Sequence, residues 1–158
     1  MHVFNSQTLK KRVDMKRILF LALLLGGNFQ LIAQSVVGRC ETYDDKTGQK
    51  ESLVEFYKKG DKLYGKMVKL YPLKGVDVNK VCAKCEDERK GKPVQGMEVF
   101  RHLRWDGEAW VDGKALHPDH GKEYNLKVWL DPKDSNKLKV RGYLGPFFAT
   151  QTWIRAKE

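Results

Sequence analysis

The chain has 158 residues, which leaves room for one domain and not two. Its formal net charge is +10, but the basic residues are scattered rather than gathered into a stripe with stacking aromatics, which argues against a nucleic-acid-binding module. Scattered lysines are typical of a solvated β-surface with soluble strand edges, although a basic excess also suits anionic partners such as lipid headgroups or polyanions.

The first 33 residues have the pattern of a secretory signal peptide. A basic stretch at 15–17 precedes a short apolar run at 18–25, and a small residue, Ala33, precedes the expected cleavage site. The run is shorter than the roughly 20 residues that a membrane-spanning helix needs. We therefore expect a periplasmic or secreted protein that begins at Gln34 and has no transmembrane segment. An uncleaved anchor is the alternative.

Residues 1–14 are polar and add nothing to this export signal, so Met15 is a candidate for the true start. Removing the first 33 residues takes away five basic residues and one acidic residue, which lowers the formal net charge from +10 to +6. A good part of the basicity therefore belongs to the targeting segment.

From residue 34 onward, short β-prone runs alternate with turn residues at the spacing of a meander. Proline and glycine mark many of the boundaries, as at Pro72, Gly107 and Pro132. No stretch has the period of about 3.6 residues that indicates a helix. The sequence predicts eight strands, at 36–43, 52–57, 63–71, 97–105, 109–116, 123–130, 138–144 and 148–155, with one long loop at 72–95.

The run at 123–130 alternates between apolar and polar side chains. Tyr124, Leu126 and Val128 share one face, and Lys127 lies on the other. This period of two indicates a strand with one buried and one solvated face. Eight such strands joined by short turns avoid exposed edges by closing into a barrel. We predict one all-β domain at 34–158, an eight-stranded antiparallel up-and-down β-barrel, with a two-sheet sandwich as the alternative.

Several motifs occur in an order that is typical of a known family. A Cys-x-x-Cys pair at 82–85 is followed by Val-Arg-Gly-Tyr at 140–143 and by Thr-Trp-Ile-Arg at 152–155. In this order they resemble the bacterial family called domain of unknown function 2147, over residues 36–156. The resemblance implies an exported protein with a lipocalin-like or calycin-like barrel, and it implies no established activity. The chain departs from the pattern after Gly38, where the family tends to carry a tryptophan.

Cys82 and Cys85 are separated by two residues within the predicted long loop. Such a pair can form a local disulfide, supply half of a metal site or carry out redox exchange. Thiols are oxidised after export, so we expect a disulfide that orders the loop. A redox enzyme would show a thioredoxin-like βαβ pattern, and a metal site would need further ligands, for which His117, His120 and Cys40 are the candidates. We predict no metal and no cofactor, and we expect Cys40 to be a small buried residue, with pairing between molecules as the alternative.

The predicted function is to hold a small apolar or amphipathic ligand, such as a lipid or fatty acid, inside the barrel. Arg101 alternates with apolar residues along its strand. If this face is interior, the charge of Arg101 must be paired, because an unpaired buried charge is costly. Arg101 is then the candidate for binding the anionic head of a ligand. The alternative is that this face is exterior. The residues expected to line the ligand site are Tyr64, Val99, Arg101, Leu103, Leu126, Val128, Val140 and Trp153.

Enzyme signatures are missing from the sequence: it has no Gly-rich phosphate loop, no Gly-x-Ser-x-Gly elbow and no His-Glu-x-x-His. Two alternatives to ligand binding stay open. One is a filled barrel that serves as a scaffold for contacts with another envelope protein, with the loop at 72–95 as a contact site. The other is a redox or metal protein built on Cys82 and Cys85.

Overall fold

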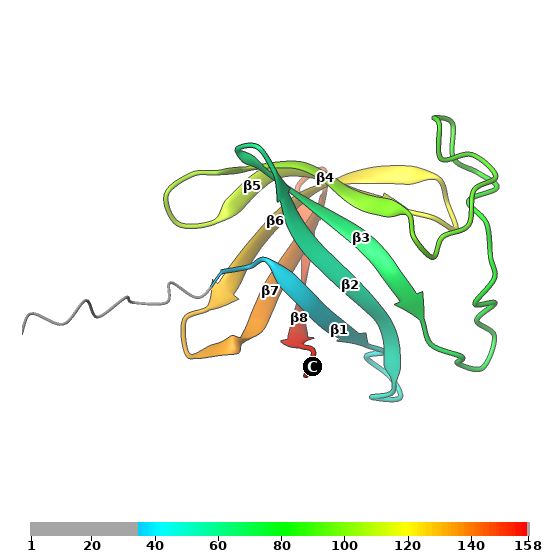
Figure 1. Cartoon of the computed structure of the whole chain (residues 1–158), viewed down its shortest axis with the longest axis horizontal. Coiled ribbons are helices and arrows are strands. Elements are labelled where there is room, and N and C mark those ends of the chain that lie inside the picture. Colours follow the sequence, from blue (N-terminus) through cyan, green and yellow to red (C-terminus); the bar gives the residue numbers. More distant parts are fainter. Residues whose placement is uncertain (1–34, 158) are drawn as a thin grey trace, which may run out of the picture. The chain divides into compact units, whose positions relative to one another are not determined.

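The computed structural model describes residues 35–157. Eight antiparallel strands follow one another around a closed barrel, so the predicted fold class is confirmed (Figure 1). The signal peptide predicted at 1–33 lies outside the described residues. Between residues 35 and 157 no helix is long and apolar enough to cross a membrane. The strands are β1 (Gly38–Tyr43), β2 (Lys50–Lys59), β3 (Lys62–Leu70), β4 (Glu98–Trp105), β5 (Trp110–His117), β6 (Lys122–Asp131), β7 (Asp134–Leu144) and β8 (Phe147–Arg155).

Two strands begin at least two residues earlier than the sequence predicts. β2 starts at Lys50 rather than at residue 52, and β7 starts at Asp134 rather than at residue 138. The pairs Tyr43↔Lys50 and Asp131↔Asp134 show that these charged residues continue the ladders. Their turn propensity is overridden because pairing with the neighbouring strand satisfies their backbone hydrogen-bonding groups.

Three aromatic side chains fill the middle of the barrel. The ring centroids of Phe56 and Phe100 are 5.7 Å apart, and those of Phe56 and Trp153 are 5.9 Å apart. Gly65 leaves room for this cluster, because a Cβ at that position would lie 2.5 Å from a ring carbon of Phe100. The larger surface cavities of the described residues lie outside this core.

The N-terminal part of the described chain closes one end of the barrel. Val36 is buried with the core, and the guanidinium of Arg155 holds the adjacent backbone. Its Nη2 donates to the carbonyl oxygen of Ser35 at 2.5 Å, and its Nη1 donates to that of Val37 at 2.8 Å. Gly38, with a φ of 120°, permits this close passage, because a Cβ there would lie 2.9 Å from Nη1 of Arg155.

Strand β4 departs from strict alternation. Its ladder with β3 shifts register on both sides of Phe100, and His102 has a φ of 63°. Phe100 therefore points into the barrel while Arg101 points outward, and Leu103 is buried inside again. The sequence predicted that Val99, Arg101 and Leu103 would share one face. Val99 and Arg101 do share the outer face, but the prediction is wrong for Leu103, because a bulge between Arg101 and Leu103 re-aims the side chains that follow it.

The long connection between β3 and β4 covers part of the outer face of the barrel. In Figure 1 it runs along the right-hand side, close to the β5–β6 turn. Three of its residues, Cys82, Cys85 and Val94, are buried, and the two cysteines join the same apolar cluster as the strand residues. Strand alternation directs Val99 and Leu116 towards the same outer face, where both are buried. The loop therefore packs on the barrel and does not hang free of it.

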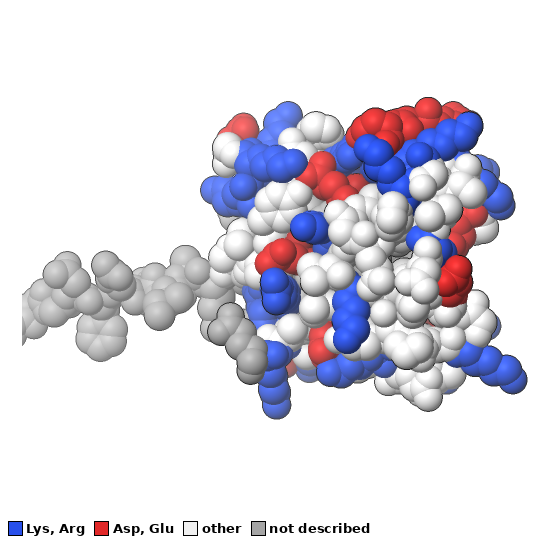
Figure 2. Space-filling view, turned by 45° about the vertical axis from the view of Figure 1, so that its right-hand side comes forward, with Lys and Arg blue, Asp and Glu red and all other residues white. Residues whose placement is uncertain are grey.

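Charged side chains are interspersed on the face that this loop covers. Figure 2 shows basic residues scattered among acidic and uncharged ones, with acidic side chains gathered beside basic ones at the upper right. No continuous basic stripe is visible on this face, which matches the scattered arrangement expected from the sequence.

Candidate functional site

The loop is attached to the β5–β6 turn through its disulfide segment. Cys82 and Cys85 are joined in a disulfide with a Cα–Cα distance of 5.5 Å, as predicted. Gly121, in the turn, has a φ of 67°, and a Cβ there would overlap the carbonyl group of Lys84. The two backbones therefore touch directly, which only glycine permits at this position.

A second attachment joins Lys80 of the loop to Asp119 of the turn, with a distance of 2.8 Å from Nζ to Oδ1. The hydrogen bond from Lys80 holds the pKa of the Asp119 carboxyl below its ordinary value. In the same turn the rings of His117 and His120 stack at 4.5 Å. Burial lowers the pKa of His117, and the neighbouring His120 adds to that effect. Cys82 cannot ligate a metal together with these histidines while its sulfur is held in the disulfide.

Arg89 is the most deeply buried charged side chain among the described residues, with 5% of its side chain exposed. Its Nη2 lies 2.6 Å from Asp87 Oδ2 and 2.5 Å from Glu123 Oε1. Its Nη1 donates to the carbonyl oxygen of Glu98 at 3.3 Å. Arg89 thereby links the loop to β4 and β6. Sequence reasoning missed it, because nothing in the local pattern separates it from the other basic residues of the loop.

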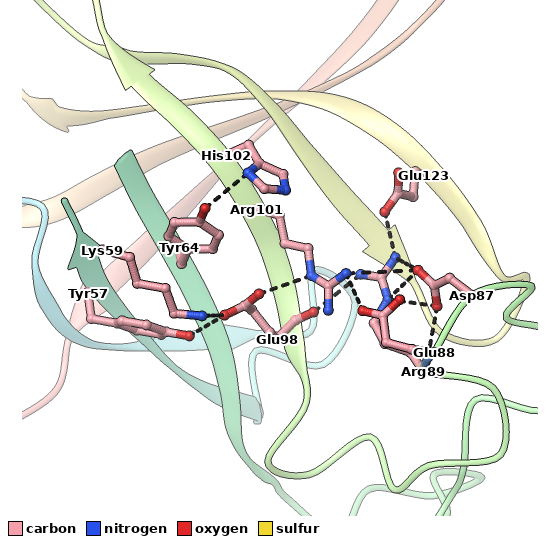
Figure 3. A network of polar contacts seen from close by, with 10 residues as sticks. All are labelled: Tyr57, Lys59, Tyr64, Asp87, Glu88, Arg89, Glu98, Arg101, His102 and Glu123. Carbon is pink, nitrogen blue, oxygen red and sulfur yellow. Dashed lines mark hydrogen bonds and ion pairs between the residues drawn. The ribbon is translucent and has the colours of Figure 1, made fainter. Parts of the chain in front are cut away.

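Arg101 continues the same network on β4. Its Nη1 lies 2.6 Å from Glu88 Oε1, and its Nε lies 3.0 Å from Glu98 Oε1 (Figure 3). The second contact is an ion pair without hydrogen-bond alignment, since Nε has no hydrogen-bond partner. The sequence predicts that Arg101 binds an anionic ligand inside the barrel. Its side chain instead lies outside the barrel, where two carboxylates neutralise its charge, so its position does not support that role.

Glu98 is the centre of the network on the β2 side. Its Oε2 accepts hydrogen bonds from the Tyr57 hydroxyl at 2.5 Å and from Lys59 Nζ at 2.6 Å. Burial by itself raises the pKa of this carboxyl, but the hydrogen bonds from Lys59 and Tyr57 and the charge of Arg101 outweigh it, so the pKa lies below the ordinary value. The chain of contacts from Lys59 to Glu98 and Arg101 and on to the loop is visible in Figure 3.

Acidification is expected to destabilise the barrel through Glu98. Its folded-state pKa is below the unfolded value of about 4.5, so its stabilisation is complete above that value and is lost as the pH falls through the folded-state pKa. Thermal unfolding midpoints of the natural chain and of Glu98→Gln, measured from neutral to acidic pH, will check this. We expect the unfolding midpoint of Glu98→Gln to fall less steeply with decreasing pH than that of the natural chain. The same pH dependence in both proteins would show that Glu98 is not the cause of the acid destabilisation. Glu55→Gln, which removes a carboxylate from an exposed ion pair, controls for the loss of one charge.

The sequence-predicted lining residues fall into two groups. Tyr64 is on the outer surface, where its hydroxyl lies 3.0 Å from His102 Nδ1, and Val99 is buried beneath the loop. Tyr64, Val99 and Arg101 are therefore outside the barrel. The other predicted residues are buried in the interior, where they pack with one another: Leu103, Leu126, Val128, Val140 and Trp153.

Cys40 is fully buried in the core, as the sequence predicts for a small apolar residue. Burial raises the pKa of its thiol to about 11, partly offset by the charge of Arg155. Because the thiolate is the reactive form, this cysteine is poorly suited to exchange or to metal binding at neutral pH.

A cavity of about 520 Å³ lies between the disulfide segment, the β5–β6 turn and the ends of β6 and β7. Its apolar side is formed by Leu116, Tyr124 and Leu144, and its charged side includes Lys84 and Lys122. Neither lysine has an ion-pair partner among residues 35–157. We call this the rim cavity, because Tyr124 and Leu144 lie at the end of the barrel where the loop and the turn meet.

A closed eight-stranded antiparallel barrel with a packed core defines the chain as a lipocalin-like protein. It belongs to the bacterial family described as "Uncharacterized protein conserved in bacteria (DUF2147)", whose model matches residues 38–155. The resemblance found in the sequence is thereby confirmed.

A solved structure supports the same fold. The chain is similar to protein HP1028 from Helicobacter pylori, which is described as belonging to the lipocalin family. The two share 20% identity over 78% of this chain and 84% of that chain, with a TM-score of 0.63. At this identity the likeness shows the fold alone. Among curated proteins, none matches the sequence.

Proposed function

We propose that the protein is exported and binds a small amphipathic molecule in the rim cavity. The observation that supports this is the cavity itself, whose volume of about 520 Å³ lies within the range of roughly 300–1,000 Å³ found for small-molecule sites. Its lining combines an apolar floor with three basic side chains, Lys84, Arg89 and Lys122, and three acidic ones, Glu86, Asp87 and Glu123. The disulfide suits an oxidising compartment, which agrees with the export signal expected from the sequence.

The ligand is expected at the rim rather than deep inside the barrel. Phe56, Phe100 and Trp153 occupy the middle of the barrel, and Gly65 brings the opposite wall close to them. A molecule at that depth would have to displace close-packed side chains, which is unfavourable. We therefore expect the ligand at the end of the barrel and not in the interior, where the sequence suggested it.

We expect an anionic end of the ligand to meet the two lysines of the rim cavity that have no carboxylate partner in the described chain, Lys84 and Lys122, and not its acidic residues Glu86, Asp87 and Glu123. Arg89 also borders the cavity, but Asp87 and Glu123 already neutralise it. The exposed amines of Lys84 and Lys122 are therefore the groups available to a carboxylate or a similar anion. The apolar part of the ligand would cover Leu144 and Tyr124, removing their apolar surface from water.

Binding of anilinonaphthalene sulfonate, an anionic apolar dye, to the chain starting at Gln34 tests this proposal. We expect Lys84→Gln/Lys122→Gln to weaken dye binding about fivefold, because two charges near the anion are removed. The matched control, Lys46→Gln/Lys62→Gln, changes two exposed lysines that do not border the cavity and should leave binding unchanged.

Native mass spectrometry of the protein from a periplasmic preparation supplies the second test. Extra mass that disappears on denaturation would support a bound molecule and identify its class. A bare mass together with equal dye binding by the natural chain and Lys84→Gln/Lys122→Gln would rule out the rim cavity as the site.

A further inference from the structure

The hairpin between β7 and β8 carries an exposed apolar tip. Leu144, Phe147 and Phe148 are 65%, 74% and 60% exposed, although they lie within five consecutive positions. Single exposed apolar residues are ordinary, but a gathered group at one projecting turn indicates a contact surface. We call these three residues the hairpin tip.

The hairpin tip projects beyond the closed part of the barrel. β1 pairs with β8 only at Cys40↔Arg155 and Glu41↔Ile154. From Phe147 to Thr152, successive residues of β8 are all exposed, although their side chains point alternately to opposite faces. In the described chain, this part of β8 has ladder partners on the β7 side alone. Both sides of the hairpin end therefore face solvent.

Cations and aromatic rings flank the hairpin tip on the outer face of β6 and β7. The guanidinium carbon of Arg141 lies 4.3 Å from the ring centroid of Phe148 and 5.2 Å from that of Trp129. Lys127 Nζ lies 5.6 Å from the same Trp129 ring. Within residues 35–157 neither Arg141 nor Lys127 has a carboxylate partner in an ion pair. Arg141 Nε donates to Thr150 Oγ1 at 2.7 Å, but no carboxylate of the described residues neutralises the charge of either cation in an ion pair, so both charges can act on an anionic surface.

We propose that the hairpin tip docks onto an anionic lipid bilayer surface. Its three apolar side chains would enter the boundary between headgroups and acyl chains, as the apolar faces of interfacial proteins do. Arg141 and Lys127 would lie at headgroup level beside Trp129, an arrangement that suits anionic headgroups and interfacial aromatic rings. Leu144 also borders the rim cavity, so the test of this proposal changes Phe147 and Phe148, which do not border it.

A second copy of the chain fits the hairpin tip less well. Symmetric pairing of two tips would bring Arg141 of one copy towards Arg141 of the other, and like charges oppose association. Three side chains at a narrow turn also bury much less surface area than the roughly 1,000 Å² that a stable protein interface buries. A bilayer accepts a small apolar wedge, because its area is not limited by the shape of a partner.

Vesicle flotation with the chain starting at Gln34 tests the proposal, because that chain lacks the apolar run at 18–25. The vesicles consist of phosphatidylcholine alone or of an equal mixture of phosphatidylcholine and phosphatidylglycerol. We expect binding to the anionic vesicles. Phe147→Ser/Phe148→Ser should lower the partition coefficient at least about tenfold, because two phenyl groups no longer leave water.

Two further variants separate the charge contribution from a loss of fold. Arg141→Gln should weaken binding to anionic vesicles about fivefold, which corresponds to one cation at the membrane surface. Trp105→Ser removes an exposed aromatic residue near the opposite barrel end, where β4 meets β5, and should leave binding unchanged. Unchanged thermal unfolding of Phe147→Ser/Phe148→Ser shows that the fold is intact.

Absence of binding to anionic vesicles, or equal binding by the natural chain and Phe147→Ser/Phe148→Ser, would overturn the proposal. Sedimentation analysis distinguishes the competing occupant. A dimer that Phe147→Ser/Phe148→Ser abolishes, together with no vesicle binding, would assign the hairpin tip to a second copy of the chain and reject the lipid surface.

Discussion

Trp153→Ala is expected to lower the free energy of unfolding by about 3–5 kcal/mol, the range for removing a buried aromatic side chain from a packed core. Trp153 packs against the rings of both Phe56 and Phe100, at centroid distances of 5.9 and 5.6 Å. Its removal leaves a cavity bordered by rigid strands on all sides of a closed barrel, so the surroundings cannot collapse into it. Urea unfolding followed by circular dichroism measures the loss.

Trp105→Ala is the matched control for this substitution. Trp105 is 51% exposed near the end of the barrel, so the same chemical change should have a much smaller effect on the free energy of unfolding. If Trp153→Ala and Trp105→Ala lowered the free energy of unfolding equally, the aromatic cluster would not be the core of the barrel. A filled core is also the reason for placing the ligand at the rim.

Arg89→Gln is expected to lower the free energy of unfolding by about 2 kcal/mol and to loosen the loop at 72–95. Removing one partner of a buried ion pair costs about 3–5 kcal/mol. The effect is smaller here because Asp87 and Glu123 are partly exposed and can be rehydrated. Arg89 holds the loop to β4 and β6, so hydrogen exchange in the loop should accelerate more than exchange in the strands.

Arg39→Gln is the control for Arg89→Gln, because Arg39 forms an exposed ion pair with Glu55 at 3.2 Å. Exposed pairs contribute about 0–1 kcal/mol, so this variant should unfold almost like the natural chain and should leave loop exchange unchanged. Uniform acceleration of exchange in loop and strands by Arg89→Gln would show that Arg89 supports the whole barrel rather than the attachment of the loop.

The loop, the disulfide and the Arg89 network together form the rim cavity with the barrel. The apolar floor comes from strands, whereas the charged side comes from the disulfide segment and from the β5–β6 turn. A loosened loop should therefore weaken dye binding in Arg89→Gln even though Arg89 is not available to an anion. This couples the stability of the loop attachment to the proposed function.

Local sequence patterns determined the strands of this protein. Strict alternation at 123–130 predicted β6 and its buried face, since side-chain direction in a regular strand depends on neighbours in the chain alone. The spacing of Cys82 and Cys85 predicted the disulfide only together with the expected export, because two residues three apart can meet in a turn and exported thiols are oxidised. The eight runs in sequence also predicted the closed barrel.

Only the tertiary structure decided where the charged side chains lie. Arg101 and Leu103 lie on opposite faces because a bulge in the β3–β4 ladder shifts the alternation between them, and a bulge depends on a partner strand that is distant in sequence. Arg89 acquires its role from Glu123, 34 residues further along the chain, and the rim cavity exists only because the loop folds back onto β6. The periodicity of the sequence predicts which face of a strand is apolar. Pairing with strands that are distant in sequence determines which residues pack against that face.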